Sequence, residues 1–247
     1  MGIIKKFILL TLVVLPINLV AEELLLSSKN KNPILIELYT SQGCSSCPPA
    51  EKYLNQFSQN KQLWDKFIPI AFHVNYWDYI GWKDIFAEPR FGRRQSRYAK
   101  LKHLRTVYTP AFITNGAVWR RGFFNAEPQV KGLSVGELNI SIKDQLIDAT
   151  FKTNKRLREK LKLNIAVLGM DMAVDITAGE NDGRQSKHSF VVLGYDERVS
   201  SEGKWQLSIP EYKKSVAAKR YAIAAWVSEL NNPAPLQAVG GWINFKK

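Results

Sequence analysis

A single C-x-x-C motif directly after an apolar run constrains this chain more than any other feature. Residues 34–40 (ILIELYT) read as a strand buried on both faces. Gly, Ser, Cys and Pro interrupt the pattern over residues 41–49, and residues 50–59 have helical apolar spacing. A second strand is expected over residues 67–74. This order predicts two parallel strands joined by a right-handed crossover, with the cysteines at the start of the helix.

The chain contains two cysteines, Cys44 and Cys47, and they form this motif. They could make a structural disulfide, but a bridge over so short a loop removes little chain entropy. A cysteine at a helix start lies near unpaired backbone N–H groups, which favour the thiolate and lower its pKa. We therefore expect Cys44 to be the exposed nucleophile of thiol–disulfide exchange and Cys47 to be the resolving thiol.

Residues 75–105 form an aromatic and then basic segment, expected to be helical in its second half. Residues 107–114 predict a strand entered through Pro110. Asn115-Gly116 is a two-residue hairpin signal, with residues 117–123 as the return strand. The pattern weakens over residues 126–136, where we expect a linker.

Short apolar segments separated by turn signals dominate the rest of the chain. This density of strands predicts a small antiparallel β-sandwich. The expected fold class is therefore α/β: a domain over residues 30–127 with a helical insertion at about 75–105, followed by a β-rich domain over residues 136–247. The expected strands cover residues 138–142, 147–151, 161–168, 173–177, 190–197, 205–209, 221–227 and 237–245.

The N-terminus has the pattern of a signal peptide over residues 1–21. Lys5 and Lys6 precede an apolar stretch that ends at Val20, and Ala21 offers a cleavage point. We expect a periplasmic or secreted protein. The formal net charge of +13 favours anionic partners such as lipid headgroups, cell-wall polymers or acidic proteins, but a charge that only keeps the protein soluble is the preferred reading. No nucleic-acid-binding motif is found, and no nucleic-acid partner is expected.

The chain resembles the thioredoxin superfamily in its motif Gly43-Cys44-Ser45-Ser46-Cys47-Pro48 and in the segment around Thr109-Pro110. More narrowly, it resembles a bacterial family of secreted thioredoxin-like proteins catalogued as a domain of unknown function. Four segments carry that likeness: ELYTSQGCSSCPPAEKYL (37–54), HVNYWDYIGWKD (73–84), TPAFITNG (109–116) and AGENDGR (178–184). This resemblance implies a thioredoxin-like first domain and a redox motif, but no particular substrate.

The resemblance also implies roles for three further residues. Pro110 is expected to be cis and to face the C-x-x-C motif, and Thr109 is expected to offer backbone hydrogen bonds to a bound peptide. Glu37 would occupy the place of a buried acid that relays a proton to Cys47. The alternative for Glu37 is an ion pair with an arginine. The serines between the cysteines depart from thioredoxin itself, which has Gly-Pro there.

Other candidate sites are weaker. His73, with Cys44 and Cys47, could hold copper or zinc, but a hydrogen-bonded structural histidine is the preferred reading, and no metal or cofactor is expected. Residues 179–184 read as a turn or as a segment that folds back toward the cysteines. A basic run predicts a solvated helix face or a surface for an anionic partner; its members are Arg90, Arg93, Arg94, Arg97, Lys100, Lys102 and Arg105.

Together these features predict an exported thiol–disulfide oxidoreductase or redox sensor that acts on protein thiols and disulfides of the cell envelope. One alternative is a binding module that keeps its cysteines as a fixed disulfide. A copper-handling protein is a further alternative.

Overall fold

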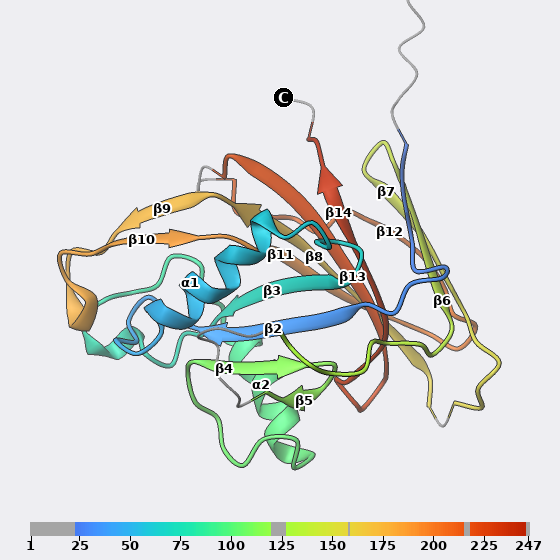
Figure 1. Cartoon of the computed structure of the whole chain (residues 1–247), viewed down its shortest axis with the longest axis horizontal. Coiled ribbons are helices and arrows are strands. Elements are labelled where there is room, and N and C mark those ends of the chain that lie inside the picture. The colour runs from blue at the N-terminus through green and yellow to red at the C-terminus, as the bar shows by residue number, and fades with distance from the viewer. Residues whose placement is uncertain (1–22, 120–126, 158, 215–217, 246–247) are drawn as a thin grey trace, which may run out of the picture.

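The structure is a computed structural model that describes residues 23–119, 127–157, 159–214 and 218–245. The predicted signal peptide and most of the expected return strand at 117–123 lie outside these residues. The described chain forms an eight-stranded sheet, a four-stranded sheet and a two-stranded ribbon (Figure 1). Among the described residues, no helix is both long and apolar enough to cross a bilayer.

The large sheet has the strand order β14-β13-β8-β11-β3-β2-β4-β5. The four-stranded sheet has the order β1-β6-β7-β12, and β9 pairs with β10. The strands are β1 (Leu24–Ser27), β2 (Ile34–Thr40), β3 (Phe67–His73), β4 (Ala111–Thr114), β5 (Ala117–Val118), β6 (Glu137–Lys143), β7 (Leu146–Lys152), β8 (Leu161–Met170), β9 (Met172–Asp175), β10 (Gln185–His188), β11 (Val191–Ser200), β12 (Lys204–Ser208), β13 (Arg220–Glu229) and β14 (Pro235–Ile243).

The strand–helix–strand unit predicted around the cysteines is confirmed. β2 and β3 are parallel, and α1 (Pro48–Gln56) connects them. β4 lies antiparallel on the other side of β2 and turns into β5 through Asn115-Gly116. Gly116 has a φ of +84°, a conformation that glycine adopts without a Cβ clash. The eight strands expected after residue 136 are also present, whereas β1 and β10 were not predicted.

The predicted α/β fold class is wrong. Fourteen strands and only two α-helices, α1 and α2 (Pro89–Lys100), are found in the described residues, so the chain is predominantly β. The separate C-terminal sandwich is also wrong, because β11 pairs with β3 in parallel at Val191 and Ala71 and joins β8, β13 and β14 to the first sheet. Hydrogen bonds of one sheet therefore connect residues on both sides of the expected linker.

The burial patterns explain this correction. β6, β7 and β12 alternate between buried and more exposed residues, as expected for strands with one face toward solvent. Every residue of β8 is buried, and so are seven consecutive residues of β13. Such fully buried runs are typical of central strands that are covered on both faces. A sandwich strand with one face toward solvent would instead alternate between buried and exposed residues.

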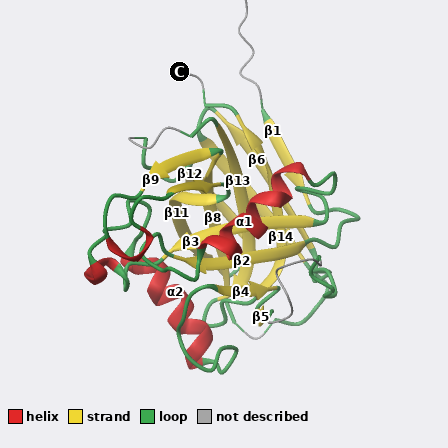
Figure 2. Ribbon diagram, turned by 60° about the vertical axis from the view of Figure 1, so that its left-hand side comes forward, coloured by secondary structure: helices red, strands yellow, loops and turns green. Residues whose placement is uncertain are grey.

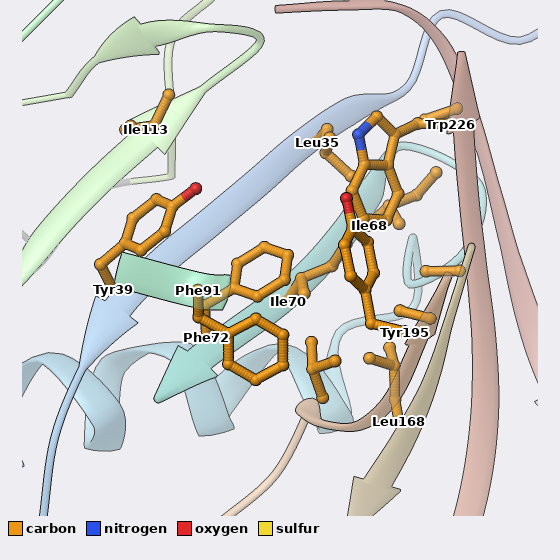
Figure 3. Close-up of a cluster of buried hydrophobic side chains, with 14 of the residues drawn as sticks. Leu35, Tyr39, Ile68, Ile70, Phe72, Phe91, Ile113, Leu168, Tyr195 and Trp226 are labelled. Atoms are coloured by element: carbon orange, nitrogen blue, oxygen red, sulfur yellow. The ribbon is translucent and has the colours of Figure 1, made fainter. Parts of the chain in front are cut away.

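Both faces of the large sheet are covered. On one face, α2 packs over an aromatic core, in which Phe72 lies against Phe91 and Tyr195 stacks on Trp226 (Figure 3). On the other face, α1 covers β2, β3 and β4, and the four-stranded sheet covers β8, β13 and β14 (Figure 2). The cysteine motif therefore lies on the α1 side, at the carboxyl ends of β2 and β3.

The segment expected to be a helical insertion at 75–105 is helical only over α2. Residues 75–88 are a loop with one 3-10 turn, Asp78–Ile80. Pro89 begins α2 at a position where its missing N–H costs no helix hydrogen bond. This loop leads from the end of β3 across the cysteine motif before the chain enters α2.

Candidate functional site

Cys44 and Cys47 form a disulfide at the start of α1, with Cα atoms 5.4 Å apart. Cys47 is the N-cap residue of α1, and Pro48 and Pro49 occupy its first turn. The N–H groups of Ala50 and Glu51 donate to the Cys47 carbonyl at 3.0 and 3.1 Å. In the reduced protein, the positive end of this nine-residue helix would favour a thiolate at the motif.

Both cysteines are buried in this oxidised form. Cys44 is 2% exposed and Cys47 is fully covered, so the expectation that Cys44 is exposed is wrong. The residues between them, Ser45 and Ser46, are exposed, and Ser46 Oγ lies 3.3 Å from Cys44 Sγ. Access to the disulfide is therefore controlled by the segments that pack around it.

The loop after β3 supplies one part of this cover. A Cβ on Gly43 would lie 3.3 Å from the Trp77 carbonyl oxygen, so Trp77 packs directly beside the first cysteine. The indole N–H of Trp77 donates to Thr109 Oγ1 at 2.7 Å. The Thr109–Pro110 peptide bond is cis, and Ala111 pairs with Tyr39 of β2. Trp77 thus connects the cysteine motif to the segment that enters β4.

A 3-10 turn, Gly179–Asn181, supplies the other part. The buried Asn181 side chain donates to the carbonyl oxygens of Gln42 and Cys44 at 2.8 and 3.0 Å. The N–H of Ser45 donates to Glu180 at 3.3 Å. Residues 179–184 were expected either to form a simple turn or to fold back toward the cysteines. In the structure this segment folds back onto the cysteines.

Glu37 is buried on the α2 side of the sheet. Its carboxylate forms an ion pair with Arg94 at 2.9 Å and accepts hydrogen bonds from the hydroxyls of Tyr39 and Tyr98. Glu37 therefore forms an ion pair with an arginine, which was the alternative prediction for this residue. Nothing in these contacts connects Glu37 to Cys47.

The basic run does not form one solvated helix face, because several of its arginines contact other parts of the protein. Arg94 is 1% exposed, a burial that helical spacing alone did not indicate. Arg90 donates to the Tyr195 carbonyl at 2.6 Å, and Arg97 pairs with Glu197 at 2.7 Å. These contacts attach α2 to β11, and an anionic partner for the remaining exposed cations stays a prediction.

His73 contributes to a buried polar cluster beneath α1 that the sequence did not reveal. Its Nδ1 lies 2.7 Å from Asp84, while His188 Nδ1 donates to Glu51 at 2.8 Å. One ligand atom from each of Glu51, His73 and His188 lies within 4.8 Å of the other two. The two sulfur atoms considered as co-ligands of His73 in the less favoured metal reading are bonded to each other.

Burial and the neighbouring side chains have opposite effects on the pKa values of this cluster. Burial by itself would raise the pKa of Asp84, but His73 holds that pKa below its usual value. Burial would lower the pKa of His73, but Asp84 raises it above its ordinary value. The pKa of Glu51 is lowered, because the neighbouring His188 outweighs the opposing effect of burial.

Two solved structures have a similar fold. The crystal structure of protein AGR_C_4864 from Agrobacterium tumefaciens has a TM-score of 0.57 and 22% identity, over 87% of this chain and 96% of that one. HBP35 of Porphyromonas gingivalis has a TM-score of 0.53 and 16% identity, over 85% of this chain and 75% of that one. At these identities the likeness shows the fold alone, and no curated protein matches the sequence. The family model described as "Protein of unknown function (DUF1223)" matches residues 35–228, and the chain belongs to this family.

Proposed function

We propose that this chain is an exported thiol–disulfide redox protein that acts through Cys44 and Cys47. The observation that carries the proposal is the position of the disulfide at the N-terminus of α1. A bridge between residues three positions apart closes a short loop and therefore stabilises the fold less than a bridge between distant segments would. The helix end instead provides what exchange chemistry needs, a site that favours a thiolate.

The reaction has two exchange steps. In the reduced protein, the Cys44 thiolate attacks one sulfur of a partner disulfide, forms a mixed disulfide and releases the other partner sulfur as a thiolate. The Cys47 thiolate then attacks Cys44 Sγ, which restores the intramolecular disulfide and releases the second partner sulfur. The partner gains two electrons and the chain loses two; run in reverse, the chain oxidises a partner dithiol.

The residues around the disulfide restrict access to both buried sulfur atoms. A partner protein reaches Cys44 only when the loop at Trp77 or the turn at Asn181 moves aside. Protein thiols and disulfides of the cell envelope are the proposed partners, because the first 21 residues have the pattern of an export signal. Exposed cations on and after α2, such as Arg93 and Lys100, would favour partners with an acidic surface.

Insulin reduction by dithiothreitol tests the proposal. The wild-type chain should accelerate the reaction, Cys44→Ser should not, and Ser46→Ala, which keeps both cysteines, is the matched control. In a separate trapping experiment in the native host, without dithiothreitol, Cys47→Ala should accumulate as a mixed disulfide with its partner, because the resolving thiol is absent. Equal rates for wild type and Cys44→Ser would show that the motif has no exchange activity.

The burial of both sulfur atoms favours one rival, a binding module with a permanent disulfide. The two functions differ in the reduced protein. Alkylation of Cys44 at varied pH should give a thiol pKa below the ordinary value of about 8.5 for a redox protein. A pKa at the ordinary value, together with a disulfide that glutathione buffers do not reduce, would support the binding module.

A further inference from the structure

The polar cluster beneath α1 lies outside the disulfide chemistry and contains metal-ligand residue types. Glu51 belongs to α1, one turn after Cys47, while His73 ends β3 and His188 ends β10. Their exposed fractions are 8%, 1% and 2%. We propose that Glu51, His73 and His188 bind a divalent cation of the zinc class.

The strongest observation is an unsatisfied nitrogen. His73 Nε2 is buried and has no hydrogen-bond partner. Its other ring nitrogen, Nδ1, is held by Asp84, and Asp84 in turn accepts the N–H groups of Gln42 and Phe86 at 2.8 and 2.9 Å. A histidine fixed by a carboxylate through one nitrogen, with the other nitrogen free, has the arrangement found behind metal-binding imidazoles. A buried polar group without a partner destabilises the fold, and a bound cation would offset that cost.

Glu51 is held from behind in the same way, since its Oε1 accepts the Thr40 hydroxyl at 2.6 Å, which leaves Oε2 toward His188. His188 Nε2 lies 3.2 Å from the Gln42 amide nitrogen, which donates to it because the Gln42 amide oxygen accepts the Trp82 indole N–H at 2.9 Å. Zinc at His188 Nδ1 would leave the ring proton on Nε2, so the Gln42 amide would have to turn. His73 and Glu51 therefore have outer partners that suit a metal ligand.

The position of His188 is fixed by the backbone around it. Asn55 of α1 donates to the Lys187 carbonyl at 2.8 Å and accepts the Ser189 N–H at 2.9 Å. These two bonds attach the end of β10 to α1, and Figure 1 shows the two elements side by side. The ribbon β9–β10 thus brings a histidine from the second half of the chain to a helix of the first half.

The donor set fits zinc in type, number and charge. Two imidazole nitrogens and one carboxylate oxygen are ligands that Zn²⁺ takes in three-ligand sites. The carboxylates of Glu51 and Asp84 balance the two positive charges of the ion. The three ligand atoms lie within 4.8 Å, wider than the roughly 3.3 Å between ligands of tetrahedral zinc, so binding would draw the side chains together.

The test is zinc titration of the full chain by calorimetry, after treatment with EDTA and with the disulfide oxidised. We expect one Zn²⁺ per chain, and an affinity lowered at least about 10-fold in Glu51→Gln and His188→Ala. The matched control is His103→Ala, because His103 is the third histidine of the chain and lies outside the cluster. In the described residues its ring contacts the Gly116 carbonyl and the edge of the Tyr98 ring. Zinc-edge absorption spectra should show nitrogen and oxygen ligands without sulfur.

Three results would overturn the proposal. The first is a folded wild-type chain that binds no zinc stoichiometrically. The second is equal zinc affinity in the His103 variant and in folded Glu51→Gln. The third concerns the cysteines. Because a chain with both cysteines replaced by serine should still bind zinc, loss of binding in that variant would place the ion at the cysteines instead. The insulin assay is independent of all these outcomes.

Discussion

Replacing Arg94 by methionine should destabilise the protein strongly. The Arg94 guanidinium pairs with Glu37 at 2.9 Å, and both side chains are 1% exposed. It also lies 5.0 Å from the Trp226 ring and 5.4 Å from the Phe72 ring. Methionine matches the length of the aliphatic part of arginine, so the change removes the charge and leaves little cavity.

The expected loss is about 3–5 kcal/mol, the usual cost of leaving one charge of a buried pair without its partner. The lower end is favoured, because Glu37 keeps the hydroxyl donors of Tyr39 and Tyr98. Glu37→Gln should cost a similar amount, since it leaves Arg94 charged and unpaired. The double variant removes both charges and should be no less stable than Arg94→Met alone, although simple addition of the two losses predicts about 6 kcal/mol or more.

Urea unfolding followed by tryptophan fluorescence measures these free energies, with the disulfide kept oxidised. Arg93→Met is the control, because Arg93 is the preceding residue of α2 and is exposed; it should change stability by less than about 0.5 kcal/mol. The reasoning is refuted if Arg94→Met is as stable as Arg93→Met, or if the losses of the two single variants simply add in the double variant.

Three further predictions test other parts of the structure. Asn181→Ala removes two hydrogen bonds to the cysteine loop and should speed reduction of the disulfide by dithiothreitol, measured by alkylation of Cys44. Glu197 has its pKa lowered from 4.5 to about 2, because Arg97 outweighs the opposing effect of burial. Its stabilisation is therefore complete above pH 4.5 and is lost as the pH falls toward 2, so urea midpoints should fall less over this range in Glu197→Gln than in wild type. Gly116→Ala places a Cβ 2.4 Å from another side chain at a φ of +84°, and should lower the melting temperature in a thermal scan.

Local sequence signals were sufficient for the region around the cysteines. The apolar run 34–40 coincides with β2, and the expected strand at 67–74 is within one residue of β3. Pro33 precedes the first run and Ser41 and Gly43 follow it, and Asn-Gly defines the later hairpin through its turn chemistry. Each of these features depends on residues close together in the chain, and they were therefore predictable.

Long-range pairing was not predictable in the same way. The addition of β11 to β3 joins residues 71 and 191, and nothing in either strand specifies the other as its neighbour. The burial of Arg94 depends on Glu37, which lies 57 positions earlier. The cluster of Glu51, His73 and His188 likewise comes from three separate elements. The residues next to a histidine or an arginine in the sequence do not show whether its side chain will be exposed to solvent or buried in an ion pair.

The junction between β3 and β11 has a consequence for how the chain acquires its structure. β11 reaches β3 at the pair Val191 and Ala71, so until Val191 has been synthesised this part of the β3 edge lacks its native partner, and an unpaired strand edge promotes aggregation. The first half therefore cannot close its sheet alone, and most native contacts must wait for the last hundred residues, which slows folding. A nascent chain of this kind would gain from a holdase that shields β3 until β11 arrives.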